Sequence, residues 1–400
     1  MQRIQKLILL LFILTPIFSI TEIFEYLGIG VVLPIDMFYI KLPKDILMIV
    51  VLFLSLTYSL RYKHPINYHI CLFLLSAFTF ICFFFSYSVN GIQIALAGIR
   101  WAIPLFLIIL LYDISNHDLL EKTTKILFAL LLLHITAQIL EMIFMPPIWG
   151  LNALGLSGRL PGIFVHPSAS GTFAAFCFFC FKYFLSQKKK MIGSILAIIS
   201  VFLSMSSTGV ILLSILLFMP IYLKSKYKLI LSSVVILFLF LIISNLDLLT
   251  GRAVGDSELS GTTRIEILQG IVDSMEFIST NFGIATNTAM NLLITLGMQS
   301  NAFIADSLYT SFLTNYGAIF FILFIGAILY LLIYLFIKKK KDIPFIIFIL
   351  ITLLSGISII IIELFPVNLI ISLYFSYFLK KHLFLSDTLF IKKGKDNNQN

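Results

Sequence analysis

Residues 308–337 read LYTSFLTNYGAIFFILFIGAILYLLIYLFI, a stretch without a charged side chain, and lysines follow it at 338–341. A helix needs roughly 20 consecutive apolar residues to cross a hydrocarbon core of about 30 Å. Because lipid offers no hydrogen-bond partner to a backbone amide, such a stretch must be helical inside a bilayer. The stretch therefore predicts a membrane-spanning helix that ends in a basic connection.

The rest of the chain repeats this pattern. Of the 400 residues 60% are apolar and 12% charged, and the mean hydropathy is +1.05. Soluble domains carry roughly 25% charged residues, so we expect an all-α polytopic integral membrane protein with a single transmembrane domain over residues 1–400. Apolar runs predict about twelve spans, at 7–24, 43–60, 66–86, 92–112, 126–146, 163–185, 191–205, 207–223, 228–247, 308–337, 343–362 and 364–380.

The distribution of basic residues predicts the orientation. Most of the 28 Lys and Arg residues lie in the terminal segments and in alternate connections, and the other connections carry few. The positive-inside rule then places both termini in the cytoplasm, and it accounts for the net charge of +9 without nucleic acid. The first apolar run lacks a small-residue cleavage site, so we expect a retained helix. The basic connections hold Arg61/Lys63, Lys122/Lys125, Lys188–Lys190, Lys224/Lys226/Lys228 and Lys338–Lys341.

The region 191–223 decides between about eleven and about twelve spans. One long helix there would put two lysine clusters on opposite sides of the membrane. We therefore expect two short helices joined at Ser206–Gly209.

Residues 248–307, between spans nine and ten, form one large extracytoplasmic loop. A loop of this length inside a compact protein is usually functional. Thr263–Glu266 has the capping-box pattern that starts a helix, and apolar residues at helical spacing up to Met275 predict an amphipathic helix at the outer membrane surface. The Lys/Asn-rich tail 391–400 is predicted to be a disordered cytoplasmic segment.

The outward side carries few basic residues, so each arginine there is a candidate for a functional role. Arg159 opens a stretch with Gly162 and two prolines that leads into span six and contains His166. A guanidinium beside free amides at a helix N-terminus is a good phosphate site. The alternative is an arginine that reaches lipid headgroups. Arg264 stands at the first turn of the amphipathic helix, where a cation opposes the helix dipole unless an anion binds there; Arg252 is the weaker case, compatible with surface charge.

Two polar residues lie within spans. Arg100 is near the middle of span four, where an arginine costs about 2.5–3.5 kcal/mol and needs a partner or a wet cavity. Glu141 and Glu363 are the candidate partners, and a structural ion pair is the alternative to a substrate contact. His134 is expected to form a helix-to-helix hydrogen bond.

Asp306 precedes Tyr309 at the outer end of span ten. A carboxylate at a helix start is often an N-cap; facing the arginines, it could instead orient or deprotonate a sugar hydroxyl. No metal-binding cluster, nucleotide-binding glycine loop or nucleophile triad is visible in the sequence.

Four short motifs stand out by their order along the chain. They are R-x-x-G-x-x-x-H-P at Arg159–Pro167, the turn Ser204–Gly209, G-x-x-R at Gly261–Arg264, and Asp306–Tyr309 with Gly317 beyond it. Together, over about residues 155–335, they resemble the O-antigen polymerase (Wzy) and O-antigen ligase superfamily of polytopic bacterial membrane proteins. In that family an arginine is common where this chain has Ser207.

The resemblance implies transfer of a glycan chain from an undecaprenyl-pyrophosphate carrier onto an incoming lipid-linked repeat unit, at the outer face of the bacterial inner membrane. It implies a glycosyltransferase without a metal or other cofactor. By this resemblance Arg159 and Arg264 bind the donor pyrophosphate and stabilise leaving-group charge. Asp306 positions or activates the acceptor hydroxyl, and His166 supplies a second polar group.

The resemblance also extends the substrate-binding set to Arg100, Arg252, Ser207 and Tyr309, with Arg100 or Arg252 compensating for the arginine absent at Ser207. The expected partners are the lipid-linked oligosaccharide, the bilayer, a chain-length regulator and a flippase. The product is O antigen of lipopolysaccharide, capsule or another exopolysaccharide.

Two alternatives remain open. Ligases of this superfamily, whose acceptor is lipid A core, typically carry a histidine where this chain has Asp306. A flippase for the same lipid-linked sugar would fit the number of spans, but transporters usually show two matching halves, and the large loop has no counterpart in the first half.

Overall fold

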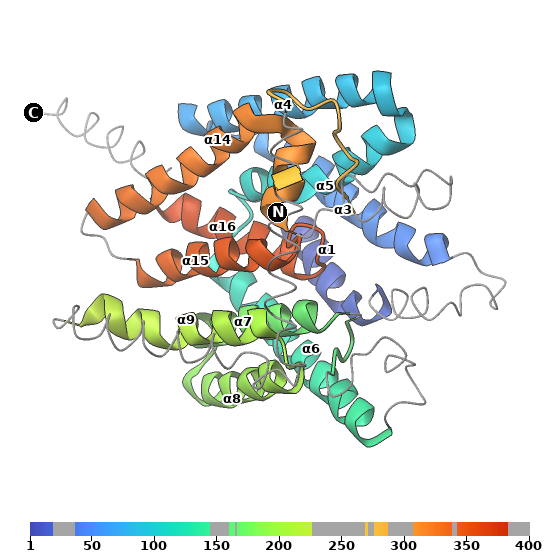
Figure 1. Cartoon of the computed structure of the whole chain (residues 1–400). Helices are drawn as coiled ribbons and strands as arrows, with labels where there is room; N and C mark the ends of the chain where they lie inside the picture. Colours follow the sequence, from blue (N-terminus) through green and yellow to red (C-terminus); the bar gives the residue numbers. More distant parts are fainter. Residues whose placement is uncertain are drawn as a thin grey trace, which may run out of the picture.

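The structure is a computed structural model of the chain, and it describes residues 1–18, 37–144, 160–164, 166–225, 269–270, 276–286, 307–337 and 342–382. Within these residues the secondary structure is helical and contains no strand (Figure 1). The helices are α1 (Gln2–Ile13), α3 (Met37–Ser59), α4 (Ile66–Asn90), α5 (Ile92–Leu110), α6 (His117–Phe144), α7 (Pro167–Phe184), α8 (Gln187–Leu203), α9 (Ser207–Lys224), α14 (Leu308–Ile337), α15 (Ile343–Ser358) and α16 (Val367–His382).

Four of these helices are long and apolar enough to cross a membrane, and they lie within α4, α5, α6 and α14. Two shorter apolar helices are α9 and α15. The described part of the chain is therefore all-helical, and its long apolar helices fit a membrane protein. The predicted span 228–247 and the tail 391–400 lie outside the described residues.

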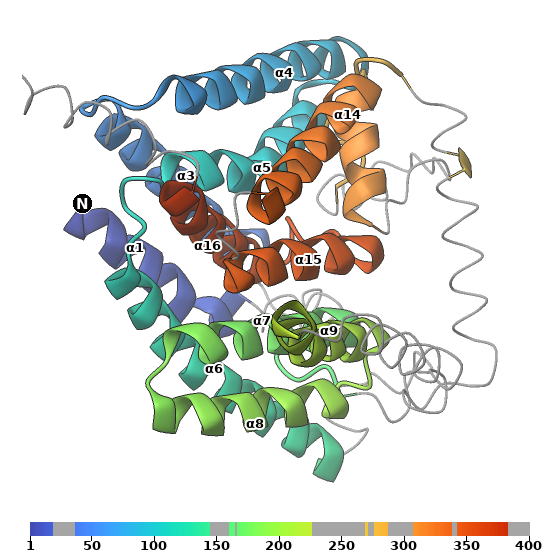
Figure 2. The ribbon, with the colours of Figure 1, turned by 90° about the vertical axis from the view of Figure 1, so that its left-hand side faces the viewer.

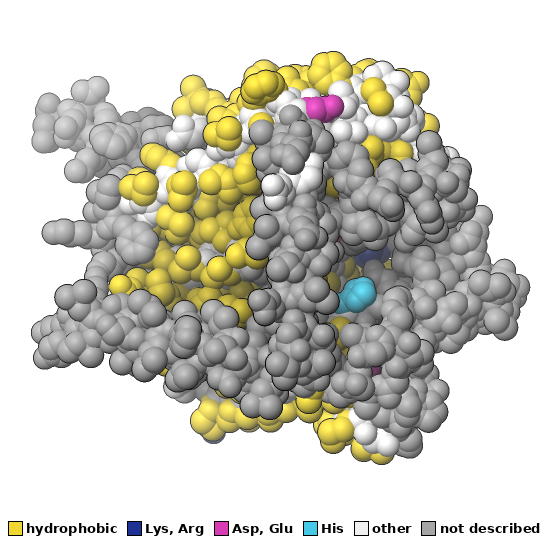
Figure 3. Space-filling model, viewed as in Figure 1, with side chains coloured by type: hydrophobic (Ala, Val, Ile, Leu, Met, Phe, Trp, Pro, Cys, Tyr) yellow, Lys and Arg dark blue, Asp and Glu magenta, His cyan; other side chains and the backbone are white. Residues whose placement is uncertain are grey.

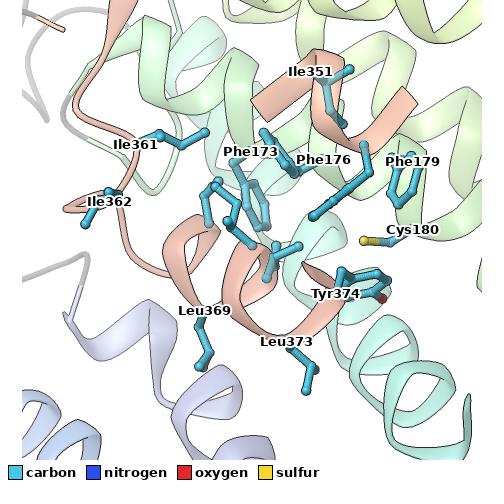
Figure 4. Packing of buried hydrophobic residues seen from close by; sticks show 14 of the residues in the cluster. Phe173, Phe176, Phe179, Cys180, Ile351, Ile361, Ile362, Leu369, Leu373 and Tyr374 are labelled. Atoms are coloured by element: carbon cyan, nitrogen blue, oxygen red, sulfur yellow. The ribbon is translucent and has the colours of Figure 1, made fainter. Parts of the chain in front are cut away.

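Helix α7 is enclosed by five neighbouring helices. From residue 173 to 181 its sequence is apolar on every side, with phenylalanines at 173, 176, 178, 179 and 181, and a helix that is apolar all round is predicted to be buried. It packs against α6, α8 and α9, and also against α15 and α16 (Figure 2). Figure 4 shows Phe173, Phe176 and Phe179 of α7 near Ile351 of α15 and Tyr374 of α16.

The outer helices carry apolar side chains on their exposed faces. Phe73 and Phe80 of α4 are 70% and 63% exposed, and Ile322 of α14 is 68% exposed. Hydrophobic side chains also dominate the described part of the face in Figure 3. A soluble monomer rarely exposes apolar surface on this scale, so these faces fit a lipid environment.

Charged side chains gather where several helices end. His64, after α3, lies 3.4 Å from Asp113, after α5, and the ammonium of Lys380 in α16 lies 5.6 Å from the Tyr112 ring centroid. The side chain of Gln5 in α1 donates to the carbonyl of Ile114. These contacts bring the start of α1, the α3–α4 and α5–α6 connections and the end of α16 together, and we call this the basic end of the protein.

The α14–α15 connection joins the basic end through Asp342. Its carboxylate lies 2.6 Å from Lys381 Nζ and 2.8 Å from His382 Nε2, both in α16. Burial raises the pKa of Asp342, but the hydrogen bonds from His382 and Lys381 outweigh burial and lower that pKa to about 2. The carboxylate is therefore ionised at neutral pH and ties the end of α16 to the start of α15.

The predicted break between the two short helices at 191–223 is confirmed. Helix α8 ends at Leu203 and α9 begins at Ser207. Met205 adopts a positive φ of 45°, and the hydroxyl of Ser206 accepts a hydrogen bond from the Gly209 amide, as an N-cap does. One helix therefore ends and a new one begins here, and Figure 2 shows α9 nearly end-on where α8 lies across the view.

Residues 279–286, which belong to the predicted outer loop, pack into the protein, with Ser279, Phe282, Gly283, Ala285 and Thr286 buried, whereas Phe277 just before them is 78% exposed. Phe282 is fully buried against Gly98 of α5, and its carbonyl accepts a hydrogen bond from Ser86 in α4. The amide of Gly283 donates to the Asn315 side chain in α14 at 2.8 Å. This segment therefore fills the space between α4, α5 and α14. The amphipathic helix predicted over Thr263–Met275 lies outside the described residues except at 269–270, which are helical.

Residues 276 and 277, just before 279–286, compensate for a break in α14. Gly317 has φ 81° and ψ 179°, so the helix is interrupted there. The amides of Ala318 and Ile319 donate to the carbonyls of Glu276 and Phe277 at 3.0 and 3.2 Å. These bonds supply the partners that the interrupted helix would otherwise lack.

We predict that Gly283→Ala destabilises the protein. Gly283 has φ +98°, and a Cβ there would collide with the Ile94 carbonyl. An alanine would therefore suffer both backbone strain and a steric clash, which should lower the stability of the fold by roughly 1 kcal/mol or more. The matched control is Gly326→Ala in α14, where nothing lies within 4 Å of the added carbon. Melting temperatures of the purified proteins, measured by size exclusion after heating, should fall for Gly283→Ala alone. Equal melting temperatures would contradict the packing described here.

Candidate functional site

The structure describes four of the eight residues that were predicted to be catalytic or to bind substrate. Arg100, His166, Ser207 and Tyr309 are described. The other four, Arg159, Arg252, Arg264 and Asp306, lie outside the described residues, and their roles stay predictions. The site is therefore built from the described residues that flank them in sequence.

His166 ends the short stretch that leads into α7. It has an extended backbone, with φ −111° and ψ 134°, and its side chain is exposed. Pro167 follows as the first helical residue, a position that tolerates proline because its missing amide needs no partner there. The carbonyl of His166 accepts the amide of Ser170. The sequence Val-His-Pro thus directs α7 to begin at 167 and leaves the imidazole at its N-terminal end.

Ser207 is the first residue of α9. Its hydroxyl oxygen is enclosed, and no hydrogen-bond partner for it is found among the described residues. The neighbouring Thr208 hydroxyl lies 2.7 Å from that of Ser358 at the end of α15. The start of α9 therefore contacts the end of α15.

The starts of α7 and α9 lie against each other through glycines. A Cβ on Gly209 would lie 2.8 Å from the Gly171 Cα, and one on Gly171 would lie 2.5 Å from the Ser206 Cβ. Small residues let the two backbones approach this closely.

Tyr309 links the start of α14 to the same region. Its hydroxyl donates to the Leu353 carbonyl of α15 at 2.7 Å, and the hydroxyl proton is used in that bond. Nearby, a Cβ on Gly356 would lie 3.1 Å from the Leu308 side chain. Through α15, the N-termini of α7, α9 and α14 come to one end of the protein, which we call the helix-start end. Each N-terminus carries a partial positive charge that favours anions.

Helix α14 has its own N-cap. The amide of Thr310 donates to the hydroxyl of Ser307 at 3.2 Å, and the two hydroxyls lie 3.0 Å apart. The sequence left an N-cap role open for Asp306, but Ser307 fills that role. The Asp306 carboxylate is therefore not needed for capping.

Three buried side chains of α6 hold the turn 160–164. His134, Gln138 and Glu141 are all buried, and they bond to the backbone of Ile163, Leu160 and Gly162 respectively. The predicted helix-to-helix bond of His134 is confirmed, since its Nε2 lies 2.9 Å from the Ser170 hydroxyl in α7. Sequence reasoning missed Gln138, although its spacing from residues 134 and 141 puts all three on one face of an apolar helix.

Arg100 pairs with a residue that sequence reasoning did not consider. Its Nε lies 3.1 Å from the Asp45 carboxylate in α3, and the side chains are 37% and 25% exposed. The prediction of Glu141 as partner is wrong, since that carboxylate accepts the Gly162 amide at 2.9 Å. Glu363 was the other candidate, and Asp45 is the partner that the structure identifies.

The described fold and site define an all-helical membrane protein with a polar end at which helix N-termini converge. Comparison of the chain with protein-family models, with curated proteins and with solved structures found no match. The family resemblance therefore stays a prediction from the four motifs.

A double-mutant cycle separates the two roles considered for Arg100. Arg100→Leu leaves Asp45 without this partner and should lower the melting temperature, whereas Arg100→Leu/Asp45→Leu should restore it, because a neutral pair avoids an uncompensated charge. If Arg100 is structural, the double variant also regains activity in the complementation assay described below. Restored stability without activity would instead assign Arg100 to the substrate.

Proposed function

We propose that the protein is a polysaccharide polymerase of the O-antigen or capsule type. It transfers a glycan chain from an undecaprenyl-pyrophosphate carrier onto an incoming lipid-linked repeat unit at the outer face of a bacterial inner membrane. The supporting observation is the convergence of the N-termini of α7, α9 and α14 at the helix-start end. Leu160 and Ser307, which follow Arg159 and Asp306 in sequence, both belong to that end.

The proposed chemistry uses charge and position. The acceptor hydroxyl attacks the anomeric carbon of the donor glycan, and the bond from that carbon to the carrier pyrophosphate breaks. Arg159 and Arg264 stabilise the negative charge on the departing pyrophosphate, aided by helix N-terminal amides. Asp306, with Ser307 serving as the cap, takes the proton from the acceptor hydroxyl. His166 contributes a polar group at the start of α7.

The flippase alternative loses support at the break in α14. Transporters often use interrupted helices whose free amides face the substrate. Here the amides after Gly317 donate to the backbone of residues 276–277. The break is thus occupied by the protein's own chain, which favours an enzyme with a fixed outer site.

The proposal includes about twelve spans with both termini in the cytoplasm. Support comes from the contacts of the basic end, where the start of α1, the end of α16 and three connections beside predicted basic clusters lie together.

Cysteine labelling tests this topology in a background with Cys71→Ser, since the other three cysteines are buried. Spheroplasts should label His166→Cys with a membrane-impermeant maleimide, and Lys63→Cys only after permeabilisation. Both replaced side chains are exposed. The reverse pattern would contradict the proposed orientation.

The activity is tested by deleting the gene in its native host and comparing surface and lipid-linked glycan on gels. Loss of the long ladder with retention of single repeat units is expected. Arg159→Ala and Arg264→Ala should each fail to restore the ladder, because loss of a group that stabilises transition-state charge costs about 10²–10³ in rate. The control is Lys189→Ala, an exposed residue in the first turn of α8, which should restore it fully.

The other outcomes separate the alternatives. Long polymer that stays on its lipid carrier would identify a ligase. Single repeats that accumulate on the inner leaflet would identify a flippase, and both results would contradict the proposed polymerase.

A further inference from the structure

Side chains of one neighbouring helix, α6, make three of the hydrogen bonds that hold the turn 160–164, and the Leu160 amide donates to the Leu203 carbonyl at the end of α8. Glu141 accepts the Gly162 amide at 2.9 Å, and His134 Nδ1 accepts the Ile163 amide at 3.2 Å. Gln138 donates to the Leu160 carbonyl at 2.9 Å. The Leu160 carbonyl and the amides of Gly162 and Ile163 are therefore paired with side chains of α6.

Further bonds fix the three side chains in place. Gln138 also bonds the hydroxyl of Ser170 in α7 and both the hydroxyl and the carbonyl of Ser200 in α8. His134 accepts at Nδ1, so its proton is on Nε2, which donates to Ser170. The network thus joins three helices to the turn.

The turn also fits its support closely. Gly162 has φ +62°, and a Cβ there would lie 2.5 Å from His134 Nδ1. Leu160, Pro161, Ile163 and Phe164 are all buried. The backbone path is therefore determined by contact with α6 on one side and by apolar packing on the other.

Placing three polar side chains in an apolar span is costly. Helix-to-helix adhesion alone needs only one such bond, as between Thr124 of α6 and Tyr374 of α16. Here each of the three groups bonds the backbone of residues 160–163, and His134 and Gln138 bond neighbouring helices as well. Rigid supporting bonds of this kind orient functional side chains at other binding sites.

We propose that His134, Gln138 and Glu141 are positioning residues, which hold the turn 160–164 and thereby support donor binding by its neighbours in sequence, Arg159 and His166, which the proposed function assigns to the pyrophosphate of the lipid-linked donor. This inference rests on the proposed function. The three residues touch no substrate and act through the backbone of residues 160–163.

The test measures binding of undecaprenyl pyrophosphate to the purified full-length protein in lipid nanodiscs. Arg159→Ala and Gln138→Leu should each raise Kd by about tenfold or more, because a small displacement of a binding group costs much of its contribution. The matched control is Thr124→Val, which removes a buried hydrogen bond from the same helix away from the turn and should leave Kd unchanged.

A double-mutant cycle distinguishes positioning from general destabilisation. If Gln138 acts through Arg159, then Gln138→Leu should have little further effect on Kd in the Arg159→Ala background. Additive effects would indicate independent action and overturn the inference.

Conservative variants of His134 keep the proposal testable where leucine variants do not fold. His134→Asn can retain the acceptor for the Ile163 amide and should bind within about threefold of wild type. His134→Gln retains the bond to Ser170 but loses that acceptor, so its Kd should rise about tenfold. Equal binding by the two variants would overturn the role assigned to His134.

The failure of this inference and the failure of the proposed function give different patterns. Wild-type binding by Gln138→Leu with weak binding by Arg159→Ala overturns the positioning role alone. Wild-type binding by Arg159→Ala overturns the proposed donor site, and with it the positioning role.

Discussion

Within a bilayer, every backbone amide and carbonyl must find its partner inside the protein. Helices meet this requirement by themselves. Each interruption of a helix leaves backbone groups that need hydrogen-bond partners from elsewhere in the protein. Three of the interruptions in the described chain lie at 160–164, at 204–206 and at Gly317. Each is satisfied by specific groups: side chains of α6, the Ser206 cap, and the carbonyls of residues 276–277. Buried polar groups therefore accompany each of these interruptions.

The two ends of the molecule differ in kind. At the basic end, ion pairs such as Asp342 with Lys381 tie helix ends together. At the opposite end, the contacts are hydroxyl and amide bonds, glycine approaches and capped helix starts. An end built from helix N-termini is suited to bind an anion brought along the membrane surface. This asymmetry supports an outer site for a lipid-linked pyrophosphate, with the basic end serving orientation.

Local features such as helices and helix breaks could be predicted from the sequence. The partners of individual side chains in other helices could not. Apolar run lengths predicted the helices, and the lysine clusters predicted the α8–α9 break that the structure confirms. The partner of Arg100 was predicted wrongly because Asp45 approaches it only through the packing of α3 on α5. The packing of residues 279–286 against α4, α5 and α14 was equally hidden, since their composition resembles that of a surface loop. Helical spacing of Gln138 with its neighbours was the overlooked signal for the α6 network. Arg159, Arg264 and Asp306 rest on motif order alone.

The central claim is that the carrier pyrophosphate binds at the end where α7, α9 and α14 begin. The most direct measurement is a cryo-electron microscopy structure of the full-length protein in a lipid nanodisc with undecaprenyl pyrophosphate. We expect density for the pyrophosphate beside the N-terminus of α7, within hydrogen-bonding distance of Arg159 and His166. Pyrophosphate density at the basic end, or midway through the bilayer, would contradict it.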